Sequence, residues 1–119
     1  MRIQLNKNVY QAALDRLEYC FNTFDNVLVS FSGGKDSGVV LNLCYEYAKQ
    51  NNMLNKLAVY HLDYEAQYQY TTDYVTNTFK KLSDIKRFWL CLPVGANCGC
   101  KLDSSVWVTW EKRKKVSLV

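Results

Sequence analysis

Ser32-Gly33-Gly34-Lys35-Asp36-Ser37 is the stretch that decides the fold of this 119-residue chain. A short apolar run, residues 26–31, precedes it, and an amphipathic run, residues 38–48, follows it. This order predicts a strand, a glycine turn and a helix whose first N–H groups have no acceptor within the helix. The helix dipole adds about half a positive charge at the same end, so the turn is suited to binding an anion.

The residues of this turn have the chemistry that a phosphate group requires. Gly33 and Gly34 lack the Cβ atoms that would hold phosphate oxygens away from the backbone amides. Lys35 adds a mobile cation, the serines add hydroxyl donors, and Asp36 can cap the helix or approach a metal ion. The same composition also suits an ordinary turn, but its position between a strand and an apolar-faced helix favours phosphate binding.

The spacing of the turn is not that of a Walker motif, because no glycine stands five residues before Gly34 and an aspartate follows the lysine. The hexapeptide instead resembles the PP-loop of the ATP pyrophosphatases and their PAPS-reductase-like relatives, the adenine nucleotide alpha hydrolases. Residues 29–31, 62–68, 89–93 and 107–110 extend the resemblance over nearly all of the chain. The chain looks most like the PAPS-reductase-like subfamily whose members are often encoded beside ParB-like proteins.

The resemblance implies an adenine nucleotide, ATP or a PAPS-like molecule, as the ligand, and it implies catalytic roles for Lys35 and Asp36. The expected nucleotide-binding residues are Ser30, Ser32, Gly33, Gly34, Lys35, Asp36, Ser37, Asp63 and Glu65. Asp63 and Glu65 are also the expected ligands of Mg²⁺, which favours carboxylates together with phosphate oxygens. The alternative is that Asp63 only ends a strand and that Glu65 is a solvated side chain.

Composition places the chain among cytoplasmic globular proteins. Its length is that of one domain, expected to span residues 1–119, and no apolar run approaches the roughly 20 residues of a membrane span. The N-terminus lacks the apolar stretch of a signal peptide. The five cysteines are odd in number and have no disulfide-type spacing, and Cys20, Cys44 and Cys91 are expected to be small buried hydrophobic residues.

Periodicity predicts alternating helices and strands. The helices are expected at residues 8–24, from the turn to about residue 50, and at residues 72–82; the strands are expected at residues 27–31, 57–62 and 87–92. The inward-facing side chains are expected to be Val9, Ala13, Leu17, Cys20, Phe21 and Phe24 in the first helix, Val39, Val40, Leu43, Cys44 and Tyr47 in the second, and Tyr74, Val75, Thr78, Phe79 and Leu82 in the third.

This alternation predicts an α/β fold, a three-layer α/β/α sandwich with a mostly parallel sheet, which is also the architecture that the resemblance implies. The first strand, apolar on both faces, is expected at the centre of the sheet. The glycine turn and the Asp63–Glu65 segment then share the carboxyl edge of the sheet, where ligands enter open α/β folds. Complete family members are longer, so the C-terminal part of the family domain is expected to be missing.

Other residues with chemical potential have simpler expected roles. His61, the only histidine, lies inside an expected strand and is predicted to be packed or hydrogen-bonded rather than catalytic. Cys98 and Cys100 match neither a thioredoxin nor a zinc pattern, and the chain lacks the Glu-Cys-Gly-x-His segment of true PAPS reductases. Tyr68 is expected either to stack on a base or to be aromatic surface.

Three functions remain open on the sequence. The first is an ATP-binding PP-loop domain that cleaves the α–β phosphate bond, adenylylates an acceptor and releases pyrophosphate. The second is a non-catalytic nucleotide-binding module that needs a protein partner or self-association to cover an exposed sheet edge. The third connects nucleotide chemistry to DNA or sulfur transfer, and it rests on the resemblance and the basic residues 112–115.

Overall fold

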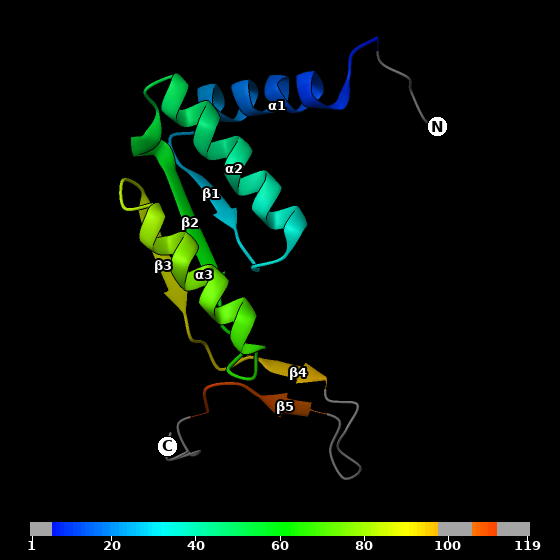
Figure 1. Ribbon diagram of the computed structural model, residues 1–119, viewed down its shortest axis with the longest axis vertical. Coiled ribbons are helices and arrows are strands. Elements are labelled where there is room, and N and C mark those ends of the chain that lie inside the picture. The colour runs from blue at the N-terminus through cyan, green and yellow to red at the C-terminus, as the bar shows by residue number, and fades with distance from the viewer. Residues whose placement is uncertain (1–5, 98–105, 112–119) are drawn as a thin grey trace.

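A computed structural model describes residues 6–97 and 106–111 of the chain (Figure 1). The elements follow in the order α1 (Val9–Thr23), β1 (Val27–Ser30), α2 (Lys35–Gln50), the 3₁₀ turn η1 (Leu54–Lys56), β2 (Leu57–Leu62), α3 (Gln69–Lys81), β3 (Lys86–Leu90), β4 (Gly95–Asn97) and β5 (Val106–Val108). The predicted range of β2 is confirmed at both ends. β3 is displaced toward the N-terminus, and α3 begins three residues earlier than expected, after Tyr68.

The first three strands form a parallel sheet in the order β1-β2-β3, which confirms the α/β class. The two crossover helices pack on one face of this sheet. Val29 and Val59, which are register partners, are buried in the same cluster as Leu41 of α2 and Val75 of α3. The described residues therefore supply one helical layer of the expected sandwich, and this layer borders the carboxyl edge where β1 leads into α2.

The position of β1 differs from the expectation, because β1 is an edge strand and β2 is the central one. The face of the sheet opposite α2 and α3 is open in the described part of the chain. Leu28 is 57% exposed and Phe88 46% exposed, and together with Tyr60 and Leu90 they line a shallow apolar hollow on this face. Apolar residues on both sides of a strand predict burial on both sides, and only one side is covered here.

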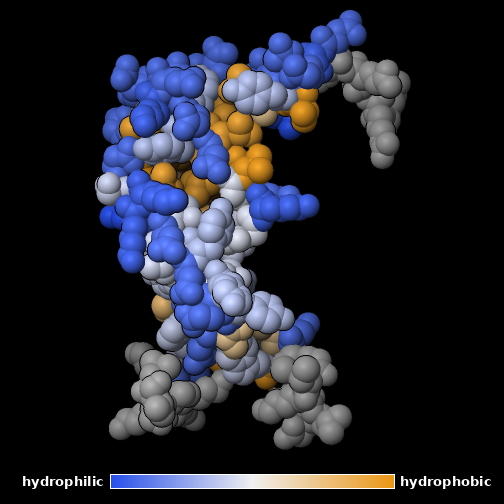
Figure 2. Space-filling view, in the orientation of Figure 1, coloured by the Kyte–Doolittle hydropathy of each residue, from blue (hydrophilic) through white to orange (hydrophobic). Residues whose placement is uncertain are grey.

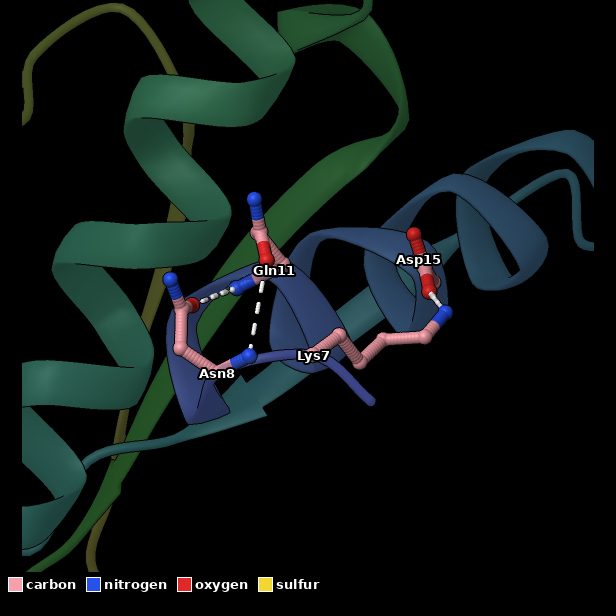
Figure 3. A network of polar contacts seen from close by, with 4 residues as sticks. All are labelled: Lys7, Asn8, Gln11 and Asp15. Carbon is pink, nitrogen blue, oxygen red and sulfur yellow. Dashed lines mark hydrogen bonds and ion pairs between the residues drawn. The ribbon is translucent and has the colours of Figure 1, made fainter. Parts of the chain in front are cut away.

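Helix α1 begins as the sequence predicts. The Asn8 side chain accepts a hydrogen bond from the Gln11 amide, and the Gln11 side chain accepts one from the Asn8 amide, which makes a capping box (Figure 3). Lys7 and Asp15 form an ion pair on the surface beside it. At the other end of α1, Lys56 Nζ donates to the carbonyl of Phe21 at 2.8 Å and so ties the helix to the start of β2.

The predicted inward faces of the first two helices are confirmed in part, since Leu17 of α1 and Cys44 and Tyr47 of α2 lie in or against the core. In α1 only Phe21 is fully buried, where it packs against Tyr47, and Val9 is 87% exposed. In α2 the buried residues are Gly38, Leu41, Cys44 and Ala48, while Val39 and Val40 are exposed. Apolar side chains of α1 and α2 gather where the two helices meet, as Figure 2 shows.

A small antiparallel pair, β4 and β5, follows the parallel sheet. Buried Thr109 joins this pair to the segment after β3, since its hydroxyl donates to the Leu92 carbonyl at 2.6 Å and its amide donates to the Val94 carbonyl. The next residue, Trp110, lies against the end of β2, where its Nε1 donates to the Asp63 carbonyl. None of the helices in the described residues has the length and apolar character of a membrane span.

Candidate functional site

The glycine turn joins the end of β1 to the start of α2, as predicted. Gly34 is the N-cap of α2 in an extended conformation, and no side chain caps the helix. Among the described residues, no hydrogen bond is made by the amides of Lys35, Asp36 or Ser37. These amides form the positive end of the helix dipole and are unpaired at the surface.

Two serines fix the shape of the turn. The Ser37 hydroxyl donates to the Gly34 carbonyl at 3.0 Å, and the Ser32 amide donates to the Ser37 hydroxyl at 3.3 Å. The two hydroxyl oxygens lie 3.0 Å apart, and the Gly34 amide donates to the Ser32 hydroxyl. The turn is held by its own side chains, so its unpaired amides are preorganised before any ligand arrives.

The two glycines differ in how strongly the structure requires a residue without a Cβ atom. Gly33 has a φ of +85°, and a Cβ atom there would lie 2.9 Å from the Cγ2 atoms of both Thr71 and Val75. Gly34 has a φ of −82°, and a Cβ there would meet only Ser32 Oγ, at 3.4 Å. Gly33 therefore permits the close approach of the turn to α3, a reason that was not predicted, while room for phosphate oxygens stays a prediction.

The expected catalytic residues lie in the first turn of α2. Lys35 and Asp36 are exposed, and neither side chain has a polar contact within the described residues. Asp36 lies near the positive end of the helix, where a carboxylate is favoured. Ser30, the last residue of β1, is exposed and pairs in register with Tyr60 of the open face, so it lies apart from the unpaired amides.

Asp63, at the carboxyl end of β2, is engaged at both carboxylate oxygens. Oδ1 accepts a hydrogen bond from the Glu65 amide at 2.8 Å, and Oδ2 accepts one from Trp89 Nε1 at 2.9 Å. Its carbonyl accepts a third bond, from Trp110 Nε1 at 2.7 Å. Through its carboxylate and its carbonyl, Asp63 therefore joins the end of β2 to β3 and to the segment after β5.

Glu65 and Trp110 are paired in unusual backbone conformations. Glu65 has a φ of +66° and Trp110 a φ of +50°, a backbone region that residues other than glycine rarely adopt. Glu65 Oε2 accepts a hydrogen bond from the Trp110 amide at 3.0 Å, so the two strained residues hold each other in place. Strain of this kind costs about 1–3 kcal/mol per residue and is concentrated at functional sites.

The donor set of this edge suits Mg²⁺ in a limited way. No group of three or more His, Cys, Asp or Glu side chains able to hold a metal occurs in the described residues. Glu65 Oε1 has no hydrogen bond there, and the Asp36 carboxylate is free as well. One or two carboxylates fit an ion whose remaining ligands are phosphate oxygens and waters, which is the usual way Mg²⁺ is held.

The predicted role of His61 as a packed, hydrogen-bonded residue is confirmed. Its side chain is 1% exposed and contacts the Phe31 carbonyl and the Gln67 amide group. The hydrogen bonds that Trp89 and Trp110 donate to Asp63 were not predicted. Their partners lie up to 47 residues away in sequence, so no local pattern could have identified them.

The cysteines divide by position. Burial, with a smaller effect of nearby Cys20, raises the pKa of the Cys44 thiol to about 11, which agrees with an inert core residue. Cys91 is exposed, contrary to the expectation, and desolvation followed by the charge of Asp63 raises the pKa of its thiol. A raised pKa disfavours a thiolate nucleophile at this edge. Cys98 and Cys100 lie outside the described residues.

Comparison with known proteins identifies the family. The model of the phosphoadenosine phosphosulfate reductase domain matches residues 26–97, which run from the start of β1 to the end of β4. The uncharacterized protein YbdN of Escherichia coli (strain K12) is 37% identical over 112 residues, which cover 92% of this chain and 27% of that protein. No solved structure matches the chain. The glycine turn, the parallel sheet and the acidic end of β2 all fall within the matched region, and the chain belongs to the phosphoadenosine phosphosulfate reductase domain family.

Proposed function

We propose that this chain binds an adenine nucleotide, ATP or a PAPS-like molecule, with its phosphates at the glycine turn. The observation that carries the proposal is the set of unpaired amides at Lys35, Asp36 and Ser37, at the N-terminus of a 16-residue helix. The exposed Lys35 ammonium adds a mobile charge beside them. Backbone amides and a lysine are what phosphate recognition at helix termini uses.

Mg²⁺ belongs to the proposal as a companion of the phosphates. Asp36 and Glu65 offer carboxylate oxygens that are free of other hydrogen bonds, and Asp63 would act beside them or through water. The ion would neutralise charge on the phosphate oxygens. This chain's own contribution is to hold the polyphosphate on the amides and to present Lys35 to it.

The proposed reaction is cleavage of the α–β phosphate bond of ATP. An acceptor oxygen or sulfur forms a bond to the α-phosphorus, the bridging P–O bond breaks, and pyrophosphate leaves with the electron pair while the acceptor proton passes to water. Lys35 and the amides of α2 would stabilise the charge that develops on the leaving pyrophosphate. Asp36 would assist as a second catalytic residue through its position in the same turn.

Replacement of Lys35 by alanine tests the proposal. We expect the Lys35→Ala variant to bind ATP at least about tenfold more weakly than the parent in calorimetric titration, because a charge-assisted contact to phosphate is lost. Lys80→Ala is the matched control, since Lys80 is also exposed but lies in the last turn of α3. Equal ATP affinity of the parent and Lys35→Ala would refute the role assigned to the turn.

A nucleotide-binding module without turnover is the second candidate function. It is favoured by the engagement of both Asp63 carboxylate oxygens in hydrogen bonds that brace the chain. This chain spans about a quarter of the relative that it matches, so the acceptor site can lie elsewhere in a longer protein. Pyrophosphate release from ATP, measured with sulfur and nucleic-acid acceptors, separates the candidates, and release no faster than the background favours the module.

The proposal also includes two kinds of partner, DNA and a protein. If the chain belongs to the subfamily encoded beside ParB-like proteins and contacts DNA, the basic residues 112–115 would make that contact. These residues lie outside the described residues. Salt-sensitive duplex binding that depends on those residues would support it, and no binding at low salt would refute it. A protein partner or a second copy would cover the open apolar face at Leu28 and Phe88, and a single monomeric species in sedimentation at high concentration would exclude self-association.

A further inference from the structure

His61 has an interaction at each ring nitrogen, and these interactions assign its tautomer. Nδ1 lies 2.8 Å from the Phe31 carbonyl oxygen, within a side chain that is 1% exposed. A carbonyl oxygen can only accept a hydrogen bond, so Nδ1 carries the proton and donates. Nε2 lies 3.3 Å from Gln67 Nε2, whose NH₂ group donates both to it and to the Leu62 carbonyl. These two partners together assign the proton of the ring to Nδ1 and the acceptor role to Nε2.

The hydrogen bond from His61 to the Phe31 carbonyl attaches β1 to β2 one residue beyond the end of β1. Strand β1 ends at Ser30, and the Phe31 amide still donates to the Tyr60 carbonyl at 2.8 Å. The Phe31 carbonyl faces the His61 side chain instead of the backbone of β2. Phe31 immediately precedes Ser32, so this contact determines where the glycine turn begins.

The same imidazole contacts the other half of the site. Its ring packs edge-to-face on Trp89, with ring centres 4.8 Å apart and an angle of 61° between the planes. Trp89 in turn donates from Nε1 to Asp63 Oδ2. His61 thus lies between the start of the glycine turn and the carboxylate at the end of β2. Phe79 also packs on the rings of Phe31 and Trp89, but His61 is the one of the two that can make a hydrogen bond to the backbone at the start of the turn.

We propose that His61 is a positioning residue, whose Nδ1–H tautomer, fixed by Gln67, holds residues 32–37 in register with Asp63 and Glu65. The proposal rests on the proposed nucleotide site for its functional consequence. It goes beyond that site because it assigns a role to buried groups that touch neither the phosphates nor the metal ion. The proposed role requires two contacts: His61 Nδ1 donates to the Phe31 carbonyl, and His61 Nε2 accepts from Gln67.

The tautomer can be measured directly, because His61 is the only histidine in the sequence. A long-range ¹H–¹⁵N spectrum of the free protein near neutral pH therefore shows one imidazole without ambiguity. We expect the tautomer with the proton on Nδ1. A predominant Nε2-protonated form, or a rapidly averaging imidazole, would overturn the assignment. Gln67→Met is expected to leave the chain folded and to introduce a mixture of tautomers, and an unchanged spectrum would remove Gln67 from the proposal.

Two substitutions separate positioning from simple packing. His61→Asn places an amide nitrogen near the position of Nδ1, and His61→Gln can place one only near Nε2. We expect His61→Asn to keep the parent's backbone amide signals for residues 32–37 and its ATP affinity within about threefold. We expect His61→Gln to shift those signals and to weaken ATP binding about tenfold while circular dichroism stays that of a folded chain. Equal behaviour of the two folded variants would overturn the proposal.

The outcomes distinguish this inference from the proposed function. If the parent does not bind ATP, the nucleotide site is refuted, and the tautomer together with the amide signals of residues 32–37 still decides the role of His61. If the parent binds ATP but the tautomer is the opposite one, only the positioning role fails. If both His61 variants unfold, the Gln67→Met spectrum and its ATP affinity decide, with an unchanged tautomer and affinity counting against the proposal.

Discussion

The glycine turn and the acidic end of β2 lie at the same edge of one sheet, yet they differ in how much of their hydrogen-bonding capacity is used. In the turn, the amides of Lys35, Asp36 and Ser37 are unpaired, and the side chains of Lys35 and Asp36 are exposed. At the end of β2, both oxygens of Asp63 and one of Glu65 accept hydrogen bonds from the chain itself.

The difference separates a region with unused backbone donors from a region whose groups brace the chain. Exposed amides at a helix terminus would exchange water for a bound anion, so the turn would break no internal hydrogen bond by accepting one. A carboxylate that already accepts two hydrogen bonds must share its oxygens or give up those bonds before it can serve a metal ion. Substitutions at the two regions should therefore affect different quantities, ligand affinity at the turn and folding stability at the acidic end, with Gly33 as the exception.

The largest effect on stability is expected at Gly33. Gly33→Ala places a Cβ at a φ of +85° and 2.9 Å from two methyl groups of α3, so we expect a loss of about 2–3 kcal/mol in the free energy of unfolding. Gly34→Ala is the matched control, with an expected loss below about 1 kcal/mol because its backbone is ordinary. Urea denaturation of both variants measures this, and equal losses would show that Gly33 is not constrained by α3.

The second largest loss of stability is expected at Asp63. Asp63→Asn replaces one accepting oxygen by an NH₂ group that faces a donor, so we expect about 1–2 kcal/mol of destabilisation in urea. Asp36→Asn is expected to lose only the interaction of the carboxylate with the helix dipole, about 0.3–1 kcal/mol, since that side chain has no hydrogen-bond partner, and to alter ATP binding in the presence of Mg²⁺. Equal stability of Asp63→Asn and the parent would contradict the bracing role.

A smaller effect is expected where the last described segment meets β2. Trp110→Phe removes the Nε1–H that donates to the Asp63 carbonyl and keeps an aromatic ring, so we expect about 1 kcal/mol of destabilisation. Hydrogen exchange should then increase at the Glu65 amide, whose turn is held by the same contact. An unchanged exchange rate at Glu65 would show that Trp110 does not support the acidic end.

The smallest effect concerns Cys91. Desolvation and the charge of Asp63 raise the pKa of its thiol, so less thiolate is present at a given pH and alkylation is slow. Asp63→Asn removes the smaller of the two causes, which lowers the pKa and should increase the alkylation rate about twofold at pH 8. Peptide mass mapping distinguishes Cys91 from the other cysteines, and a slower rate in the variant would contradict the sign.

Much of the local structure could be predicted from the sequence, because local signals define it. The capping box at Asn8 and Gln11, the strand Leu57–Leu62 and the turn between β1 and α2 all appear where the pattern places them. Each depends on residues within a few positions of one another. The buried, hydrogen-bonded state of His61 also follows from its place on an inward-facing position of β2.

The faces of the helices could not be predicted reliably. In α2 the run Val39-Val40-Leu41 is apolar throughout, so two neighbouring stripes fit the helical period equally well. Contact with β1, β2 and α3 buried the stripe that contains Leu41, Cys44 and Ala48, and left Val40 exposed. Periodicity identifies an amphipathic helix but does not say which apolar residues its partners cover.

The sequence by itself determined a glycine turn at a strand-to-helix junction, because the unpaired amides of a helix N-terminus follow from the chain order alone. Only the tertiary structure decided that Gly33 packs against Thr71 and Val75, that Trp89 and Trp110 donate to Asp63, and that His61 holds the start of the turn. Those contacts join residues from 26 to 47 positions apart. Hydrogen bonds and close packing depend on positions in space, and local sequence patterns carry no record of them.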